Sequence, residues 1–327
     1  MIGVAVISLV LFGFVALATS AFLALAWPRL VGRLNVVAPE ARTKVIAALF
    51  LSPGLAGALV LLISFGPCIG AHLAGLPDTC AEHGGPRLFL CLHHDGSPSA
   101  LAWFLAAGLI ARGLYVLFGV GRAALMTSRL ARVLRQVGSR KMPEGYVLVP
   151  GNASFTAGAL RGDVFVGADL AATIDPAGLA VVVAHERAHQ RHHHVLAKIA
   201  ARALAVLHLP WIGRRLTTEL DTALEQACDL EAARAVGDPL LVADSLIAVA
   251  RLRAATPEGA LAGFADAADA LARRVNALCS PPWGAAGGTG VVAAFMGFAA
   301  ALLVAVTALF DRPLHDVTEA LLQILGS

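Results

Sequence analysis

The sequence has few charged residues, and they are unevenly placed. Only 14% of the residues are Asp, Glu, Lys or Arg, against 58% hydrophobic residues, and the mean hydropathy is +0.75. A soluble domain has about 25% charged residues, so the sequence predicts a protein of the lipid bilayer. The net charge of +3 is small, and the basic residues do not alternate with aromatic ones, which argues against direct binding of nucleic acid.

Four long apolar runs account for this hydropathy. Each is long enough to cross a hydrocarbon core, which takes about 20 helical residues. They extend from about Met1 to Ala26, Val45 to Gly66, Ala100 to Gly121 and Gly290 to Phe310. The first resembles a secretion signal, because Ala24-Leu-Ala looks like a cleavage site, but no Lys or Arg precedes it and it is longer than a typical signal core. We interpret it as a retained span.

Basic residues between the apolar runs predict the orientation, because positive charge is retained on the cytoplasmic side. The connection between the first two runs has four basic residues and one acid, and the segment after the third run has six basic residues before its first acid. The connection between the second and third runs has one basic residue and three acids. We therefore expect a multi-pass protein of the cell membrane with both termini outside and a large cytoplasmic segment.

This layout predicts a mainly α integral membrane protein with four transmembrane helices. Residues 1–121 form a three-span membrane domain with an external loop at 67–99, and residues 122–284 form a cytoplasmic α+β domain. Residues 285–327 form the fourth transmembrane helix and a short external tail. The external loop has Cys68, Cys80 and Cys91, which predicts one disulfide and one free thiol. Its four histidines leave an external metal or redox sensor as an alternative.

Short strands are predicted at the start of the cytoplasmic segment. Residues 145–150 contain strand-forming side chains followed by turn residues. Residues 153–167 have the composition of two brief strands, joined by a turn around residues 161–163. We expect these strands to offer a sheet edge.

Two helices are predicted to carry the chemistry of this segment. Asp175 and Pro176 indicate a helix start, because Asp caps free amide groups and Pro fits the first helical position. We expect this helix to continue through the histidine-rich segment. A second helix is expected to begin at Thr217 or Thr218, whose hydroxyls can cap it, and to end at Gly237.

His185, Glu186 and His189 form a pattern typical of zinc peptidases. Two histidines four residues apart on a helix project from one face and can give two imidazole nitrogens to one zinc ion. Glu186 can take a proton from a water that the metal activates and pass it to the leaving amine. The preceding apolar run, residues 179–184, would bury the opposite side of the helix, which favours a metal site over two surface histidines. The pattern predicts hydrolysis of peptide bonds with one catalytic zinc ion.

A catalytic zinc site needs a third protein ligand and one open position. Glu225 and Asp229 lie four residues apart on the second predicted helix, so they share a face. We expect Glu225 to be the third ligand and Asp229 to hydrogen-bond to a ligand histidine and fix its tautomer. A solvated acidic face with Glu219, Asp221 and Glu231 is the alternative.

Four other features have metal-binding or charged side chains. Cys228 is expected to be a small buried residue at a helix contact. Residues 192–194, all His, cannot converge on one ion within a helix, because consecutive residues diverge by about 100°, so exposed histidines are expected. His208 is a candidate for stabilising the oxyanion. Arg112, the only charge inside the third run, could couple the spans to the catalytic segment, mark a helix break or snorkel.

The predicted order along the chain is three spans, then His185-Glu-Arg-Ala-His189, then Glu225-Gln-Ala-Cys-Asp229, then a fourth span. In this order of features the chain resembles the BlaR/MecR family of membrane metallopeptidases. These are bacterial sensor-transducers with a cytoplasmic gluzincin-type zinc domain between membrane spans. The resemblance implies that His185, His189 and Glu225 hold the zinc. It also implies Glu186 as the base, Asp229 as the supporting acid and a winged-helix repressor of the BlaI/MecI type as the substrate.

Two features depart from the family pattern. Family members often have an Asp shortly after the second histidine, where this chain has His193 or His194. Sensor members continue after the fourth span into a large extracellular ligand-binding domain, whereas seventeen residues follow the fourth run here, so direct sensing of beta-lactams is not expected. Residues 152–158 also look like the substrate-edge region of HtpX/Ste24-type membrane proteases, in which an extended peptide pairs with a strand.

The leading hypothesis is a regulatory membrane endopeptidase that acts on a cytoplasmic protein. A quality-control protease of the HtpX/Ste24 type is one alternative, and it would cleave misfolded membrane proteins broadly without a dedicated repressor. A non-proteolytic sensor is the other. It would use zinc only to hold the fold and would pass a signal from the external loop through the third span.

Overall fold

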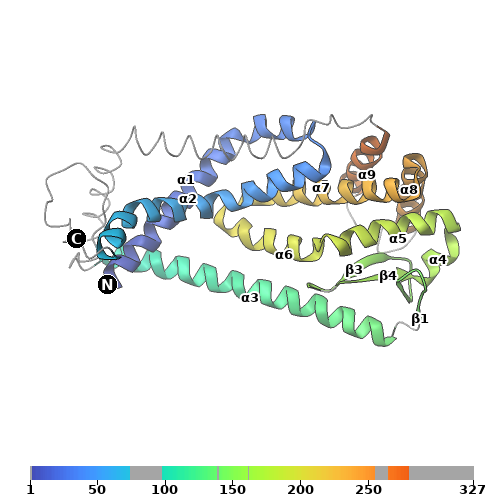
Figure 1. Cartoon of the computed structure of the whole chain (residues 1–327), viewed down its shortest axis with the longest axis horizontal. Helices are drawn as coiled ribbons and strands as arrows, with labels where there is room; N and C mark the ends of the chain where they lie inside the picture. Colours follow the sequence, from blue (N-terminus) through green and yellow to red (C-terminus); the bar gives the residue numbers. More distant parts are fainter. Residues whose placement is uncertain (1, 74–97, 138–139, 161, 255–263, 280–327) are drawn as a thin grey trace.

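Three long apolar helices, together called the membrane half, lie mainly in the left part of the molecule, and one of them, α3, continues beneath the sheet on the right (Figure 1). They are α1 (Ile2–Leu34), α2 (Pro39–Leu73) and α3 (Ala100–Val137). Each contains a segment long and apolar enough to cross a bilayer, which supports a multi-pass membrane protein. The computed structural model describes residues 2–73, 98–137, 140–160, 162–254 and 264–279. The predicted fourth span and most of the predicted external loop, with Cys80 and Cys91, lie outside these residues.

These helices are longer than the predicted spans. α1 continues past Ala26 and includes Pro28. α2 continues to Leu73, so that Cys68 and His72, which the sequence assigned to the external loop, lie in a helix. α3 extends over 38 residues, from the third apolar run through the basic segment. At 1.5 Å per residue it is about 57 Å long, nearly twice the thickness of a hydrocarbon core. A single helix therefore connects the membrane half to the second half.

A small sheet follows α3 in the chain. It has four strands, β1 (Arg140–Lys141), β2 (Val147–Val149), β3 (Ser154–Ala157) and β4 (Asp163–Gly167), in the spatial order β1-β2-β4-β3. The strands predicted in residues 145–150 and 153–167 are therefore confirmed. β3 pairs antiparallel with β4, and β2 pairs parallel with β4. This order makes β3 the last strand on its side of the sheet.

The sheet lies between α3 and α5 (Pro176–Arg191), because β4 is apolar on both faces. Successive residues of a strand point to opposite faces. Val164 and Val166 pack with Val182 and Val183 of α5, whereas Phe165 packs with Ala131 of α3. All three β4 side chains are buried. The sheet therefore fixes α5 at a defined distance from the basic end of α3.

Helices form the remainder of the second half. They are α4 (Ala168–Thr173), α5, α6 (His194–Leu204), α7 (Pro210–Val236), α8 (Pro239–Ala254) and α9 (Phe264–Cys279). α5 begins as predicted, because Asp175 Oδ1 accepts the N–H of Gly178 at 2.7 Å and Pro176 is the first helical residue. α7 ends before Gly237, whose φ of 77° lies in the left-handed region that favours glycine.

Two predicted helix boundaries are wrong. The helix expected to pass through the histidine-rich segment ends at Arg191, and α6 begins at His194. His193 between them has a φ of 52°, which a right-handed helix cannot contain. α7 begins at Pro210 rather than at Thr217 or Thr218. The Thr217 hydroxyl donates to the carbonyl oxygen four residues earlier, inside the helix, and therefore caps nothing.

The hairpin turn, residues 205–209, joins α6 to α7 and reaches the membrane half. Its first part is a short 3-10 helix, η2 (Ala205–Leu207). The guanidinium of Arg112 on α3 donates to the carbonyl oxygen of Val206, at 3.0 Å from Nη2 and 3.3 Å from Nε. Of the three roles considered for Arg112, the structure therefore favours coupling of the third span to the catalytic segment.

The hairpin turn contacts α1 and α2 as well. The backbone N–H of Leu209 donates to the hydroxyl of Ser20 on α1 at 2.8 Å. His208 Nε2 lies 3.3 Å from the carbonyl oxygen of Phe50 on α2, and the two rings meet edge to face. All three long helices thus make a polar contact with one five-residue turn.

Apolar packing of α7 against α1 and α2 extends these contacts. Ile212 and Leu216 of α7 share a buried cluster with Ile46 and Leu49 of α2 and Trp27 of α1. Leucine and isoleucine side chains fully buried in this way each contribute about 1.5–3 kcal/mol relative to exposure. The membrane half and the second half therefore share one core.

Leu216→Ala is expected to destabilise the protein by about 2–5 kcal/mol, because Leu216 is 0% exposed in this shared core. The measurement is the midpoint of thermal unfolding of detergent-solubilised protein, followed by size-exclusion fluorescence. Leu240→Ala is the matched control, since Leu240 on α8 is 63% exposed and its loss should change stability by less than about 0.5 kcal/mol. Equal midpoints for the two variants would contradict the packing of α7 on the membrane helices.

Candidate functional site

Two histidines of α5 direct their Nε2 atoms at one point. His185 and His189 lie one helical turn apart, and their Nε2 atoms are 3.2 Å from each other. Val182 and Val183, which precede the motif on α5, pack on the sheet. The apolar run before the motif therefore fixes α5 against the sheet.

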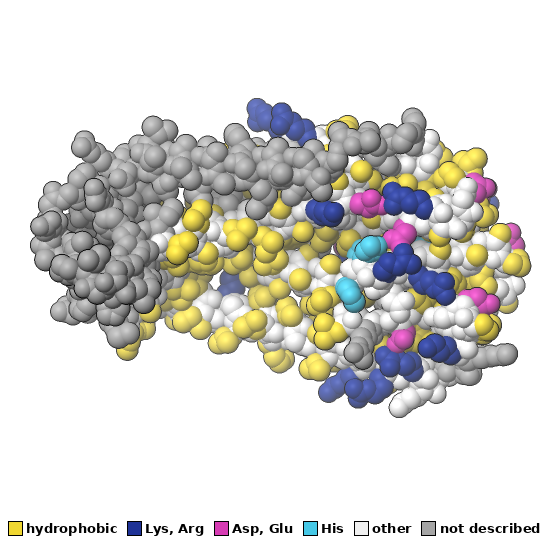
Figure 2. Space-filling model, viewed as in Figure 1, with side chains coloured by type: hydrophobic (Ala, Val, Ile, Leu, Met, Phe, Trp, Pro, Cys, Tyr) yellow, Lys and Arg dark blue, Asp and Glu magenta, His cyan; other side chains and the backbone are white. Residues whose placement is uncertain are grey.

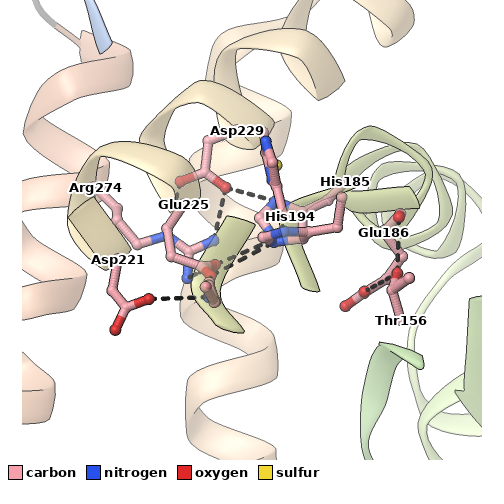
Figure 3. Close-up of polar contacts among 11 residues, drawn as sticks. Thr156, His185, Glu186, His194, Asp221, Glu225, Asp229 and Arg274 are labelled. Carbon is pink, nitrogen blue, oxygen red and sulfur yellow. Dashed lines mark hydrogen bonds and ion pairs between the residues drawn. The ribbon is translucent and has the colours of Figure 1, made fainter. Parts of the chain in front are cut away.

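The carboxylate of Glu225 on α7 lies next to both histidines (Figure 3). Glu225 Oε2 lies 3.4 Å from His185 Nε2, and Oε1 lies 3.5 Å from His189 Nε2. One donor atom of each of the three residues lies within 4.8 Å of the others. The fold thus brings together the three residues that the sequence predicted as ligands, although Glu225 lies on a separate helix.

These spacings fit a zinc ion. In a tetrahedral site with bonds of about 2.0–2.1 Å, neighbouring donor atoms lie about 3.3 Å apart. The separations of 3.2, 3.4 and 3.5 Å are close to this value. Two imidazole nitrogens and one carboxylate also form a donor set used by catalytic zinc sites, and they leave a fourth position open. Spacing and donor chemistry therefore both suit one zinc ion.

Asp229 contacts His185 from the side opposite Nε2. Its Oδ1 lies 2.9 Å from His185 Nδ1, close enough for a hydrogen bond although the alignment departs from ideal geometry. Burial alone would lower the pKa of His185, but the contacts with Asp229 and Glu225 outweigh it and raise the pKa to about 9. Metal binding at Nε2 must therefore displace a proton. Asp229 is 1% exposed, which excludes a solvated acidic face at this position.

Arg274 on α9 fixes the carboxylate of Asp229, and the sequence analysis missed it. Its Nε and Nη2 donate to Oδ2 and Oδ1, each at 2.7 Å, which is the bidentate geometry that sets orientation as well as charge. Burial alone would raise the pKa of Asp229, but the hydrogen bonds from Arg274, with that of His185, outweigh it and lower the pKa. Arg274 belongs to no motif and lies 45 residues after Asp229, so spacing gave no indication of the contact.

Lys198 on α6 is a second residue that the sequence analysis missed. Its Nζ lies 3.2 Å from Glu225 Oε1 and 3.4 Å from Asp221 Oδ1. Burial alone would lower the pKa of Lys198, but Glu225 and then Asp221 outweigh it and raise the pKa, so the amine stays charged. Burial alone would raise the pKa of Glu225, but the contacts with the two ligand histidines hold it well below the ordinary value. Glu225 is therefore ionised and ready to bind a cation.

The break at His193 brings His194 against His189. His194 Nδ1 lies 2.9 Å from His189 Nδ1, and its side chain is buried. Burial, and then the neighbouring His189, His192 and Lys198, lower the pKa of His194 to about 3. A neutral His194 can accept the Nδ1–H of His189 and leave the Nε2 lone pair free for a metal. The expectation of exposed histidines is confirmed for His192 and His193 and wrong for His194.

A second group of potential ligands consists of His189, His194 and Cys228. Cys228 Sγ lies 3.4 Å from His194 Nδ1. Burial, and then the nearby carboxylates, raise the pKa of the Cys228 thiol, so it stays neutral and is a poor metal ligand. We therefore assign this group to the support of His189 rather than to a second ion. The prediction that Cys228 is a buried residue at a helix contact is confirmed.

Glu186 faces β3 rather than the other acids (Figure 3). The hydroxyl of Thr156 on β3 lies 3.0 Å from Glu186 Oε2 and 2.9 Å from the backbone carbonyl oxygen of Glu186. The carboxylate of Glu186 is buried and shares a cavity with the ligand histidines. Thr156 therefore links the edge strand to the residue that the sequence predicted as the base.

One cavity of about 460 Å³ is lined by the three predicted ligands and Glu186, and by their contacts Thr156, His194, Lys198, Asp229 and Arg274. β3 forms one wall with residues 154–156, and Val182, Val242 and Leu246 make part of the lining apolar. Its size is that of a typical site for a small ligand or a few residues of peptide. His208 lies in the hairpin turn and does not line this cavity, which removes it as an oxyanion candidate.

Residues 122–257 match the model of Peptidase family M48. The match begins in the basic part of α3 and includes the sheet, both metal motifs and α8, whereas Arg274 lies beyond it. It supports a membrane metallopeptidase that hydrolyses peptide bonds, in a family that typically depends on zinc. A protein substrate follows from that activity, and the apolar helices imply a lipid bilayer as surroundings. No curated protein and no solved structure shows significant similarity to the chain.

His194→Leu is expected to weaken zinc binding by about 10- to 100-fold, because His189 Nδ1 loses its acceptor. His194→Asp retains an acceptor and should bind zinc nearly as tightly as the unmodified protein. The measurement is a competition titration against a fluorescent zinc chelator at fixed pH. His193→Asn is the matched control, because His193 is exposed and Asn tolerates its positive φ. Equal zinc affinity in His194→Leu and in this control would contradict the supporting role.

Proposed function

We propose that this chain is a zinc endopeptidase of the membrane whose site faces the cytoplasm and whose general base is Glu186. The observation that carries this proposal is the convergence of His185, His189 and Glu225 in the same cavity as Glu186, next to an edge strand. One zinc ion held by these three residues would supply Lewis acidity, which polarises a peptide carbonyl and acidifies a water molecule.

The carboxylate of Glu186 accepts the proton of the attacking water and delivers it to the leaving nitrogen of the peptide. Thr156 Oγ1 lies within hydrogen-bond distance of both the side chain and the backbone carbonyl of Glu186, so it restricts the position of the carboxylate before substrate binds. A group placed in advance contributes more to catalysis than one that must be ordered during the reaction.

The supporting contacts hold the donor atoms in one arrangement. Asp229, oriented by Arg274, keeps the proton of His185 on Nδ1, and His194 does the same for His189. Such contacts set the tautomer and the ring orientation of ligand histidines. Both imidazoles therefore present Nε2 to the same point.

β3 provides the means of binding an extended peptide. It is the last strand on its side of the sheet, and its residues 154–156 line the cavity. An unpaired strand edge binds a peptide through main-chain hydrogen bonds, which hold the scissile bond at a fixed register. Thr156 on this strand contacts Glu186, so a peptide on the edge would lie beside the base.

The proposed substrate is a cytoplasmic protein, by resemblance to the BlaR/MecR family a winged-helix repressor of the BlaI/MecI type. The six basic residues between Arg122 and Lys141 favour the cytoplasmic side for the adjoining peptidase segment. β3 also suits the quality-control alternative, because main-chain pairing is tolerant of sequence. The range of proteins that the chain cleaves distinguishes a regulatory protease from a quality-control protease.

Glu186→Gln is expected to lower the rate of peptide cleavage by about 100- to 10,000-fold and to leave close to one zinc per chain, because the substitution removes the base and no ligand. Glu225→Ala is expected to lose both zinc and cleavage. Metal content and cleavage are measured on the detergent-purified full chain. Glu144→Gln, on the exposed turn before β2, is the matched control and should keep both. If the unmodified protein is folded and binds no zinc, the proposal is wrong.

A regulatory protease is expected to cleave a cognate repressor at one position and to spare unrelated chains. The measurement is cleavage by the purified chain of a winged-helix repressor encoded beside it, in parallel with a misfolded membrane protein, with the sites read by mass spectrometry. Glu186→Gln serves as the inactive control in each reaction. Cleavage of the misfolded protein at many positions, with the repressor left intact, would establish the quality-control function instead.

A further inference from the structure

A second cavity lies where the hairpin turn joins α7. It has a volume of about 400 Å³ and is lined by α6, the hairpin turn and the first turns of α7. Its charged walls are Arg202 on α6 and Arg214 on α7. Gly213 of α7 also lines the cavity, and an added Cβ there would lie 2.9 Å from the carbonyl oxygen of Ala205. The hairpin turn and α7 therefore approach closely at this cavity.

The guanidinium groups of the two arginines of this cavity have no anionic partner among the described residues. Both side chains are exposed, and neither guanidinium makes a hydrogen bond or an ion pair with any residue that the structure describes. Some other arginines do have carboxylate partners: Arg135 with Asp163, Arg191 with Glu231, Arg234 with Glu40, and Arg274 with Asp229. Lys198, one turn before Arg202, is itself paired with Asp221 and Glu225. The cavity thus presents two uncompensated positive charges from two helices.

The position of the hairpin turn places this cavity near the membrane surface. The hairpin turn contacts Ser20, Phe50 and Arg112. Each of these residues lies between five and nine residues inside the end of its predicted span that faces the cytoplasm. At 1.5 Å per residue this is a depth of roughly 8–14 Å. Arg202 and Arg214 lie within about two helical turns of the hairpin turn, on helices that lead out of the membrane half. That distance places their guanidinium groups at the level of the lipid headgroups.

Trp211 also indicates that this cavity lies at the level of the lipid headgroups. It follows the first residue of α7, its side chain is 41% exposed, and the guanidinium carbon of Arg215 lies 5.5 Å from its ring centroid. Tryptophan is enriched where hydrocarbon meets headgroups, and basic residues accompany it there. Figure 2 shows hydrophobic side chains gathered over the centre of the view and charged ones mainly over the right-hand part, which in Figure 1 holds α5 and the sheet. Trp211 follows Pro210, which lines the cavity, so its position agrees with a cavity at the headgroup level.

We propose that this cavity binds the phosphate of an anionic phospholipid headgroup. Guanidinium groups bind phosphate oxygens through paired N–H donors, and none of the described residues that line the cavity is acidic. The bound lipid would contact α6 and α7 at the turn that joins them, and these helices also provide Lys198 and Glu225 to the metal centre. Lipid binding does not depend on peptidase activity.

The test is native mass spectrometry of the full chain, released from detergent after addition of phosphatidylglycerol or phosphatidylcholine. Phosphatidylglycerol is expected to bind at least about tenfold more tightly than phosphatidylcholine, and Arg202→Gln combined with Arg214→Gln should lower its affinity about tenfold or more. Arg33→Gln is the matched control, because Arg33 is an exposed arginine of α1 outside the cavity. It removes one charge near the membrane and should change affinity less than about twofold.

The thermal midpoint and the zinc content of each variant establish that it is folded. Glu186→Gln should bind phosphatidylglycerol as the unmodified chain does, whatever the outcome of the peptidase tests.

Three results would overturn the proposal. Equal affinity for the two lipids would remove the anionic preference. A loss in Arg33→Gln as large as in the double variant would show general surface attraction. Displacement of the lipid by millimolar inorganic phosphate would assign the cavity to a soluble anion.

Discussion

The buried chain of contacts from His185 through Asp229 to Arg274 is the interaction on which the arrangement of the site depends. Asp229 is almost completely removed from water, and a buried carboxylate without partners costs several kcal/mol. His185 on α5 and Arg274 on α9 provide those partners at 2.7–2.9 Å. Three helices are therefore tied to one carboxylate, and Glu225, one turn earlier on α7, is placed against the histidines as a consequence.

The same helix α7 links the site to the membrane half. Its first turns pack between α1 and α2, its middle carries Glu225 and Asp229, and Gln226 beside them accepts a hydrogen bond from Arg42 of α2 at 2.8 Å. α6 has a parallel role, because it begins with His194 next to His189 and ends in the hairpin turn (Figure 1). A displacement of the long helices would therefore reach the candidate metal site through α6 and α7.

Features that depend on near neighbours in the chain were predictable from the sequence. The spacing of His185 and His189, the cap at Asp175 and the strands of the sheet all follow from local periodicity and turn chemistry. Contacts between distant segments were predictable only where a zinc site required them, as for Glu225 and Asp229 with the two histidines. Arg274 could not be predicted, because nothing in its surroundings marks a partner on another helix, and the positive φ of His193 has no sequence signature in a non-glycine residue. The start of α7 was missed although Pro210 is a favourable first helical residue, since two threonines suggested a later cap.

The region that matches Peptidase family M48 does not contain all the partners of its own buried charges. Asp229 lies inside residues 122–257, whereas Arg274 lies after them, and the apolar partners of α7 lie before them on α1 and α2. Removal of α9 would leave Asp229 with a single partner, and removal of the long helices would expose the apolar face of α7. The stability of the candidate metal site is therefore a property of the larger chain. The motifs inside the matched region specify the donor atoms. The flanking helices, α9 on one side and α1 and α2 on the other, supply the charge and the apolar surface that hold those atoms in position.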